Sequence, residues 1–166
     1  MSLKWYGAEI ESKLDQAMIA GLEACAVTVE GKAALLCPVN MGRLRGSITH
    51  RTVYERSVAK SPAKPSDAVQ AIPKKNEAYV GTNVNYASWV EFGRLPGKMP
   101  PVDMIAEWVR QKKIASGKEL MKAAWAIAMS IKRRGIKPKS FLRKAADDSR
   151  GILDSIFTNA FKKVMK

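Results

Sequence analysis

Residues 79–93 read Tyr-Val-Gly-Thr-Asn-Val-Asn-Tyr-Ala-Ser-Trp-Val-Glu-Phe-Gly, and the interpretation of the whole chain begins from this stretch. Val, Tyr, Trp and Phe favour a pleated, half-buried surface. Gly81, Asn83 and Asn85 tolerate the positive φ angles that a tight bend requires. The pattern therefore predicts two short strands around a turn, and the second strand ends at Gly93.

The residues before this stretch predict a long helix and a partner strand. From about Lys4 to Leu36, apolar residues recur at three- and four-residue steps, which is a helical period. The members of this stripe are Ile10, Leu14, Ala17, Met18, Gly21, Cys25, Thr28 and Leu35. The stripe either packs on the protein's own sheet or pairs with another helix as a coiled coil. Gly21 and Gly31 either permit close packing or mark a bend. Pro38 ends the helix, and a strand is predicted from about Leu44 to Tyr54.

The positive charge is concentrated in two segments of the chain. The formal net charge is +14. Residues 105–144 contain 12 Lys and Arg against 2 Asp and Glu, and residues 56–75 contain 5 against 1. Residues 56–75 also contain three prolines and few large apolar residues, which predicts a mobile basic loop between two antiparallel strands. Such a loop can reach a neighbouring subunit or DNA, or it can simply be solvated.

Helices are predicted for most of the chain after Gly93. Asp103 can cap a helix whose apolar face contains Met104, Ile105, Trp108 and Val109. After a break at Ser116-Gly117, a helix from Lys118 to Arg134 has two apolar rows. These rows are Leu120, Ala124, Ile127 and Ile131, and Met121, Trp125 and Met129. A helix with two apolar rows is either a well-covered core helix or part of a subunit interface. A final helix is predicted from about Ser140 to Met165.

The sequence contains no pattern typical of an enzyme, a metal site or a cofactor site. There is no Gly-rich phosphate loop, no metal-ligand cluster and no nucleophile–base motif. Glu91 is the one acid expected near the sheet, and a single carboxylate is weak evidence for acid–base catalysis. His50 has no second histidine and no carboxylate at metal-ligand spacing. Cys25 and Cys37, on one helix, would lie about 18 Å apart, so free thiols in a reducing compartment are expected.

Nothing in the sequence predicts a membrane span or a secretory signal. No apolar run approaches the roughly 20 residues that a membrane-spanning helix needs, and the start of the chain lacks the charged and apolar regions of a signal peptide.

Charged residues at bends and helix ends are the candidate contacts with a neighbouring subunit or DNA. The candidates are Arg43, Arg45, Lys60, Lys64, Lys74, Lys75, Glu91, Lys132, Arg133 and Arg134. The first two flank Leu44 and can bind a phosphate or a partner's carboxylate, or they can be two solvated arginines at a turn.

Three short motifs occur in order along the chain. They are Pro38-Val39-Asn40-Met41-Gly42-Arg43-Leu44-Arg45-Gly46-Ser47-Ile48, Tyr86-Ala87-Ser88-Trp89-Val90-Glu91-Phe92-Gly93 and Lys137-Pro138-Lys139-Ser140-Phe141-Leu142-Arg143-Lys144-Ala145. With the long N-terminal helix, this order resembles the head–tail joining or tail-completion proteins (minor tail components) of long-tailed bacteriophages and prophages. The chain departs from the shortest family pattern by about 40 residues inserted between Gly93 and Lys137.

The resemblance implies an α+β fold in which the long N-terminal helix and the C-terminal helices pack on a small, mostly antiparallel sheet of about three to four strands. At 166 residues the chain is most simply a single domain, with a helical insertion at about 102–135. The resemblance implies no catalysis and no cofactor. The expected partners are further copies of the chain in a ring and other neck or tail proteins, with non-specific contact to packaged DNA. The expected location is the host bacterial cytoplasm during assembly and then the virion. A basic nucleic-acid-binding protein is the alternative, because residues 105–144 are strongly positive.

Overall fold

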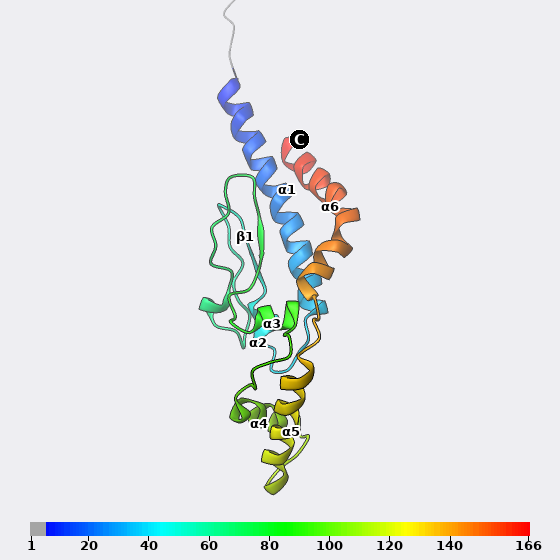
Figure 1. Cartoon of the computed structure of the whole chain (residues 1–166). Coiled ribbons are helices and arrows are strands. Elements are labelled where there is room, and N and C mark those ends of the chain that lie inside the picture. Colours follow the sequence, from blue (N-terminus) through cyan, green and yellow to red (C-terminus); the bar gives the residue numbers. More distant parts are fainter. Residues whose placement is uncertain (1–5) are drawn as a thin grey trace, which may run out of the picture. The chain divides into compact units, whose positions relative to one another are not determined.

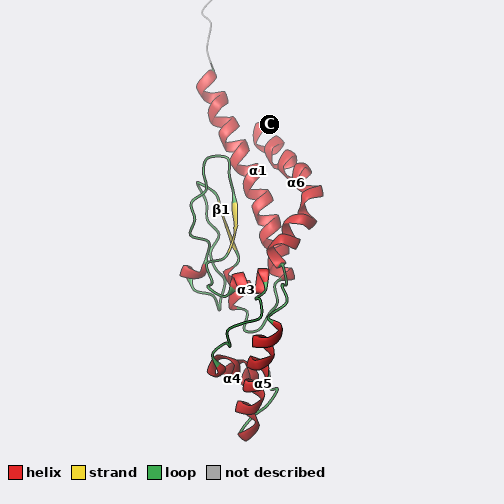
Figure 2. Ribbon diagram, viewed as in Figure 1, coloured by secondary structure: helices red, strands yellow, loops and turns green. Residues whose placement is uncertain are grey.

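The computed structural model describes residues 6–166 and has the α+β class predicted from the sequence. Figure 2 shows that helices dominate and that the strands are short. Contacts divide the chain into two compact units, Met1–Ala87 with Ser140–Lys166, and Ser88–Lys139. We call them unit 1 and unit 2 and describe each by itself. The prediction of a single domain concerns how the two units fold together and stays a prediction.

Unit 1 is built on two long helices that pack along each other, α1 (Gly7–Leu36) and α6 (Phe141–Met165) (Figure 1). The predicted helix from Lys4 to Leu36 is confirmed within the described residues, and its first two residues lie outside them. The main partner of α1 is α6 rather than the sheet. The buried positions of α1 are small, which lets α6 approach closely; they are Ala17, Gly21, Ala26 and Ala33.

The close approach is clearest at Gly21. A Cβ built on Gly21 would lie 2.5 Å from both Cδ2 and Cε2 of Phe157, so the ring of Phe157 occupies the space that a side chain would need. Gly31 has no neighbouring atom within 4 Å of such a Cβ. Of the two roles predicted for these glycines, Gly21 permits close packing, and the helix continues through both of them.

A two-stranded antiparallel sheet lies beside α1 in unit 1. β1 (Thr49–Arg51) pairs with β2 (Tyr79–Gly81), and His50 lies opposite Val80. The predicted antiparallel pairing of these two segments is therefore confirmed. The sheet is smaller than the three to four strands expected, because the other predicted strand residues are in helices or loops.

The predicted strand from Leu44 to Tyr54 is mostly wrong. Its first part belongs to a short helix, α2 (Arg43–Ser47), which follows Gly42 in the left-handed conformation with φ +80°. The β-branched residues that favour a strand begin only at Ile48. The strand ends after three residues, and Thr52 begins a turn in which its hydroxyl accepts a hydrogen bond from the Glu55 N–H at 2.9 Å.

The second strand predicted in residues 79–93 is also wrong, because Ala87–Phe92 forms a helix, α3. Its buried residues, Ala87 and Glu91, are four positions apart, which is a helical spacing and not an alternating one. The predicted end at Gly93 is confirmed, because this residue has φ +74°. A Cβ there would also collide with the carbonyl oxygen of Ile136.

The segment 56–75 contains more packed structure than predicted. It includes a 3₁₀ helix, η1 (Pro65–Asp67), and both Asp67 and Ala68 are buried. The Val69 N–H donates to the Thr49 hydroxyl at 2.8 Å, which ties the segment to β1. Its predicted mobility stays a prediction.

Unit 2 contains a pair of packed helices, α4 (Val102–Gln111) and α5 (Lys118–Arg134). They coincide with the predicted helical insertion. Their shared core is small; it contains Ala106, Val109 and Ala124, with Val102, Ile105, Ala115, Leu120, Ala123 and Ile127 packed against it. The predicted apolar face of α4 is therefore only half right, because Met104 and Trp108 are exposed. The second apolar row of α5 is also uncovered at Met121 and Trp125.

Candidate functional site

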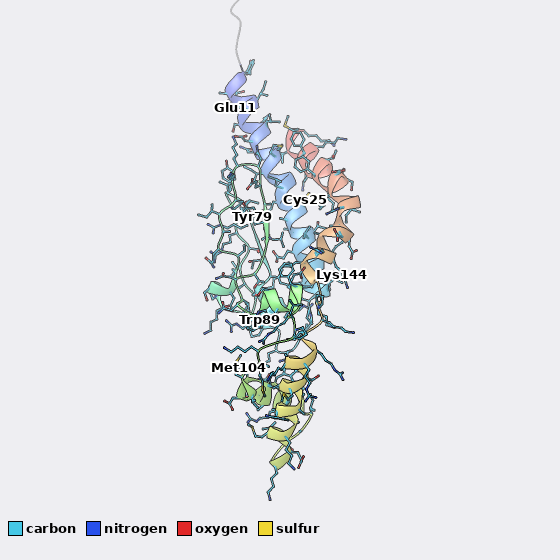
Figure 3. The ribbon with its side chains drawn as sticks, in the orientation of Figure 1. Glu11, Cys25, Tyr79, Trp89, Met104 and Lys144 are labelled. Atoms are coloured by element: carbon cyan, nitrogen blue, oxygen red, sulfur yellow. The ribbon has the colours of Figure 1, made fainter. Side chains whose placement is uncertain are left out.

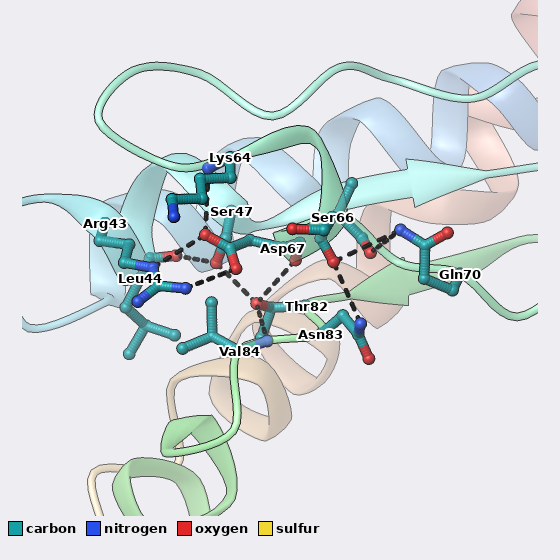
Figure 4. A network of polar contacts seen from close by, with 11 residues as sticks. Arg43, Leu44, Ser47, Lys64, Ser66, Asp67, Gln70, Thr82, Asn83 and Val84 are labelled. Atoms are coloured by element: carbon teal, nitrogen blue, oxygen red, sulfur yellow. Dashed lines mark hydrogen bonds and ion pairs between the residues drawn. The ribbon is translucent and has the colours of Figure 1, made fainter.

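The most extensive polar network among the candidate residues surrounds Arg43 in unit 1 (Figure 4). Its guanidinium makes a bidentate contact with Asp67, in which Nε donates to Oδ2 at 2.8 Å and Nη2 donates to Oδ1 at 2.7 Å. The Lys64 backbone N–H donates to the same carboxylate at 3.0 Å. Such charge-assisted, two-point contacts are among the strongest hydrogen bonds in proteins.

The hydrogen bonds from Arg43, followed by that from the Lys64 N–H, lower the pKa of Asp67 to about 2. Each of them stabilises the ionised carboxylate. The backbone around the carboxylate is fixed as well, because the Thr82 hydroxyl donates to the Asp67 carbonyl oxygen at 3.3 Å and lies 2.6 Å from the Ser47 hydroxyl. The network therefore joins α2, η1 and the end of β2.

This network changes what can be expected of the predicted arginine pair. Arg43 already has a carboxylate partner within its own chain, although 46% of its side chain is exposed. A phosphate or a partner's carboxylate would share or replace Asp67. Arg45 is exposed on the same helix. Contact of either arginine with a partner stays a prediction. The one sequence signal for Asp67 was that it is the single acid in the basic segment 56–75.

The lysines of segment 56–75 are not gathered into one site. Lys64 lies beside Asp67 at η1, and the Lys60 N–H donates to the Gly46 carbonyl at 2.7 Å. Lys75 is paired with Asp15 of α1, with 2.9 Å between Nζ and Oδ2. Lys74 is exposed next to it. The basic segment is therefore spread along unit 1, and one of its cations is already offset by an acid.

His50 lies in a buried polar cluster that the sequence did not predict. Its Nδ1 lies 2.6 Å from Glu30 Oε2, and its Nε2 contacts Glu23 Oε1. The Ser57 hydroxyl also donates to Glu30, at 2.8 Å. The sequence shows no carboxylate at metal-ligand spacing from His50, and these two carboxylates come from α1, 20 and 27 positions away. The signal was that Glu23 and Glu30, seven positions apart, share one face of α1.

The His50 cluster has a structural role. A neutral imidazole has one N–H and one acceptor nitrogen, so two carboxylates on its two nitrogens require a further proton on the ring or on a carboxylate. Glu23 Oε2 is buried and has no hydrogen-bond partner in the described part of the chain. No group of three or more His, Cys, Asp or Glu side chains within residues 6–166 is arranged to hold a metal ion. The cluster ties β1 to α1.

The two cysteines are free thiols, as the sequence predicts. Burial raises the pKa of the Cys37 thiol to about 11, and the opposing effect of the Arg45 charge is smaller. Burial also raises the pKa of the Cys25 thiol, whose S–H donates to the Leu153 carbonyl oxygen at 3.5 Å. Thiols with raised pKa values are poor nucleophiles at neutral pH.

In unit 2, the candidate residues fall into two different environments. Glu91 is buried on α3, which favours its structural interpretation over a subunit contact. Lys132, Arg133 and Arg134 are all exposed in the last turn of α5. Cations there face the negative end of the helix dipole, so they stabilise the helix whether or not they bind a partner. Gly135 follows them with φ +71°.

Comparisons with known proteins give no assignment for this chain: no family model, no curated protein and no solved structure matches it. Within residues 6–166, no helix is both long enough and apolar enough to cross a membrane.

Proposed function

We propose that this chain is a non-enzymatic virion assembly protein of a long-tailed bacteriophage or prophage. It forms or completes a ring at the head–tail junction or at the tail end. Its partners are further copies of itself and other neck or tail proteins. The observation that carries the proposal is the order of three motifs whose matching residues occupy positions that the fold constrains.

The first motif surrounds the start of α2. Gly42 has φ +80° directly before the helix, a conformation that glycine adopts at little cost. Leu44, Ser47 and Ile48 are buried. The Ser47 hydroxyl donates to the Leu44 carbonyl oxygen at 2.7 Å. The spacing of glycine, leucine, serine and isoleucine in this motif therefore matches a local structure that needs those residue types.

The second motif and the start of the third meet in unit 2. A Cβ on Gly93 would lie 2.9 Å from the Pro138 nitrogen, and the Lys139 N–H donates to the Val90 carbonyl oxygen at 2.8 Å. The rest of the third motif begins α6 in unit 1, where Phe141 and Ala145 are fully buried. Segments about 45 residues apart in the chain are thus in contact through residues of both motifs, which supports interpreting the motifs together.

The test combines the purified chain with phage particles. Light scattering at high protein concentration and negative-stain electron microscopy should detect rings, and labelled antibody should bind virions at the neck or the tail end. Portal, capsid and tail-tube genes beside the gene for this chain are also expected. A chain that never forms rings and never occurs in virions would refute the proposal.

A specific observation also favours the alternative function, nucleic-acid binding. Unit 2 contains 12 Lys and Arg against 4 Asp and Glu, and Trp89 and Trp125 are exposed rather than buried. Exposed aromatic rings among cations are typical of single-strand binding surfaces. Against this, the Arg94 guanidinium already lies over the Trp89 ring, 5.7 Å from its centroid. Titration with duplex and single strands at several salt concentrations decides: tight, sequence-selective binding supports the alternative, and weak non-specific binding does not.

A further inference from the structure

One face of α1 lines an open groove in unit 1. Residues from Ala8 to Ile19, with Tyr54, line its first part. Residues from Gln16 to Thr28, with Glu55 and Ile156 of α6, line its second part. The two parts share Gln16 and Ile19, so they form one groove about 30 Å long by the rise of α1. In Figure 1 the first turns of α1 extend past the C-terminal end of α6, and the residues that line the first part of the groove include none of α6.

The groove has an apolar floor and acidic edges. Ile19, Ala20, Ala24, Val27 and Ile156 supply apolar surface, and 51% of Val27 is exposed. Four carboxylates lie along the groove: Glu11, Asp15, Glu23 and Glu55. Asp15 is paired with Lys75, and Glu23 contacts His50. Glu11, which Figure 3 labels near the start of α1, and Glu55 are exposed and can meet an external cation.

The outer face of α5 in unit 2 has the complementary chemistry. Met121, Trp125 and Met129 form a row at four-residue steps, and half or more of Met121 and Trp125 is exposed, 50% and 54%. At about 100° per residue, Lys118, Lys122 and Lys132 project on the same side of the helix as this row. Lys122 is paired with Glu119 at 3.0 Å, but both side chains are largely exposed, so the pair contributes little. The face is therefore apolar at its centre and basic at both ends.

We propose that the outer face of α5 in one copy of the chain binds in the α1 groove of the next copy. The 17 residues of α5 span about 25 Å, which fits within the groove. An amphipathic helix in an apolar groove is a recurring mode of recognition. A second copy is the occupant because the chain carries both complementary surfaces. Such a head-to-tail contact is heterologous and generates rings when its rotation closes.

The contact places its strongest residues at the centre. Trp125, flanked by Met121 and Met129, covers the middle of the groove floor around Ile19 and Ala20, and tryptophan at the centre of an interface is a frequent hot spot. Lys118 and Lys132, on either side of this centre, face acidic edges that include Glu11 and Glu55. Opposite charges of this kind mainly fix orientation and speed association. The inference rests on the proposed ring-forming function and supplies its subunit contact.

Two complementary variants test the contact. Trp125→Glu disrupts the α5 face and leaves the groove intact. Ala20→Glu places a carboxylate in the middle of the groove floor and leaves α5 intact. Sedimentation from about 1 to about 100 µM measures association, and circular dichroism checks that each variant is folded. We expect the unmodified chain to assemble and each variant alone to weaken assembly about tenfold or more. An equimolar mixture should form a one-to-one heterodimer that grows no further. The matched control is Leu95→Glu, at an exposed leucine of unit 2 outside α5, and it should assemble normally.

Each other outcome overturns the proposal. A chain that stays monomeric over the whole range has no such contact. If both variants assemble as well as the control, other surfaces hold the copies together. If only one of the two variants fails to assemble, the α5 face and the groove do not bind each other. If both variants fail and their mixture gives no heterodimer, the two surfaces are not complementary. The proposed function can fail separately from the proposed contact. If the chain assembles through this contact but never occurs in virions, the phage role is refuted. If rings occur in virions and both variants still form them, only the contact is refuted.

Discussion

Replacing Gly21 by alanine should act very differently from replacing Gly31, although both glycines lie within the same helix α1. In a helix interior alanine is more favourable than glycine by about 1 kcal/mol. At Gly31 an added methyl group meets no atom within 4 Å. Gly31→Ala should therefore raise the free energy of unfolding by up to about 1 kcal/mol.

At Gly21 the same gain is opposed by a collision. The new methyl carbon would lie 2.5 Å from two ring carbons of Phe157, whereas favourable carbon–carbon contacts lie at about 3.5–4.0 Å. The ring has to move by about 1 Å, and the ring of Phe161 packs against it with 6.0 Å between the two centroids. Forcing an extra methyl group into a packed site costs about 1–3 kcal/mol. Gly21→Ala should therefore be neutral to about 2 kcal/mol destabilising.

The difference between the two variants isolates the ring contact, because the helix propensity and chain entropy terms are shared. Urea unfolding followed by circular dichroism should place Gly21→Ala about 1–3 kcal/mol below Gly31→Ala. In a Phe157→Leu background the difference should shrink, because leucine lacks the ring that the methyl group meets. Equal stabilisation by the two substitutions would refute the close approach of α6 at this position.

Three further predictions concern buried and paired groups of unit 1. The pKa of Asp67 is lowered from 3.8 to about 2. The contribution of the Asp67 carboxylate to the free energy of unfolding is therefore present above pH 4 and lost as pH falls towards 2. Asp67→Asn should lower the free energy of unfolding by about 1–3 kcal/mol at pH 7, and this difference from the unmodified chain in urea unfolding should narrow to near zero at pH 2. His50→Gln should lower the unfolding free energy by about 3 kcal/mol, measured by the same titration, since two carboxylates lose their shared partner; an unchanged value would contradict the cluster. Cys25 and Cys37 should react slowly with iodoacetamide at pH 7.5 in the folded chain and rapidly in urea, because burial raises both pKa values; fast labelling of the folded chain would disagree with that burial.

The helical period of the apolar residues was the sequence signal that gave the most accurate predictions of secondary structure. The long helices were predicted nearly to their ends, because tens of residues with one repeating pattern constrain a boundary strongly. The antiparallel pairing of residues 49–51 with 79–81 was also predicted. The failures lie in short segments, at 43–47 and 87–92, where aromatic and β-branched residues were taken as strand formers. Strand propensity depends on what covers each face, and a six-residue sequence does not contain that information.

The sequence did not predict the polar contacts, for a different reason. Arg43 of α2 with Asp67 of η1, and His50 of β1 with Glu23 and Glu30 of α1, join residues about 20 to 27 positions apart. Composition and spacing identify charged residues but not their partners in space. Two of the candidate cations, Arg43 and Lys75, already bind acids that the sequence did not identify, Asp67 and Asp15. Contact of the candidate residues with a partner stays a prediction.

The residues that the three motifs share give more information about the fold than about assembly. The residues that the motifs share are glycines with positive φ and side chains of the interior, such as Gly42, Gly93 and Phe141. Such residues specify local backbone and packing. The surface that we propose for self-association, the outer row of α5 around Trp125, lies outside every motif. The proposed resemblance therefore rests on residues of the backbone and the interior, whereas the proposed ring contact rests on the chain's own α1 groove and α5.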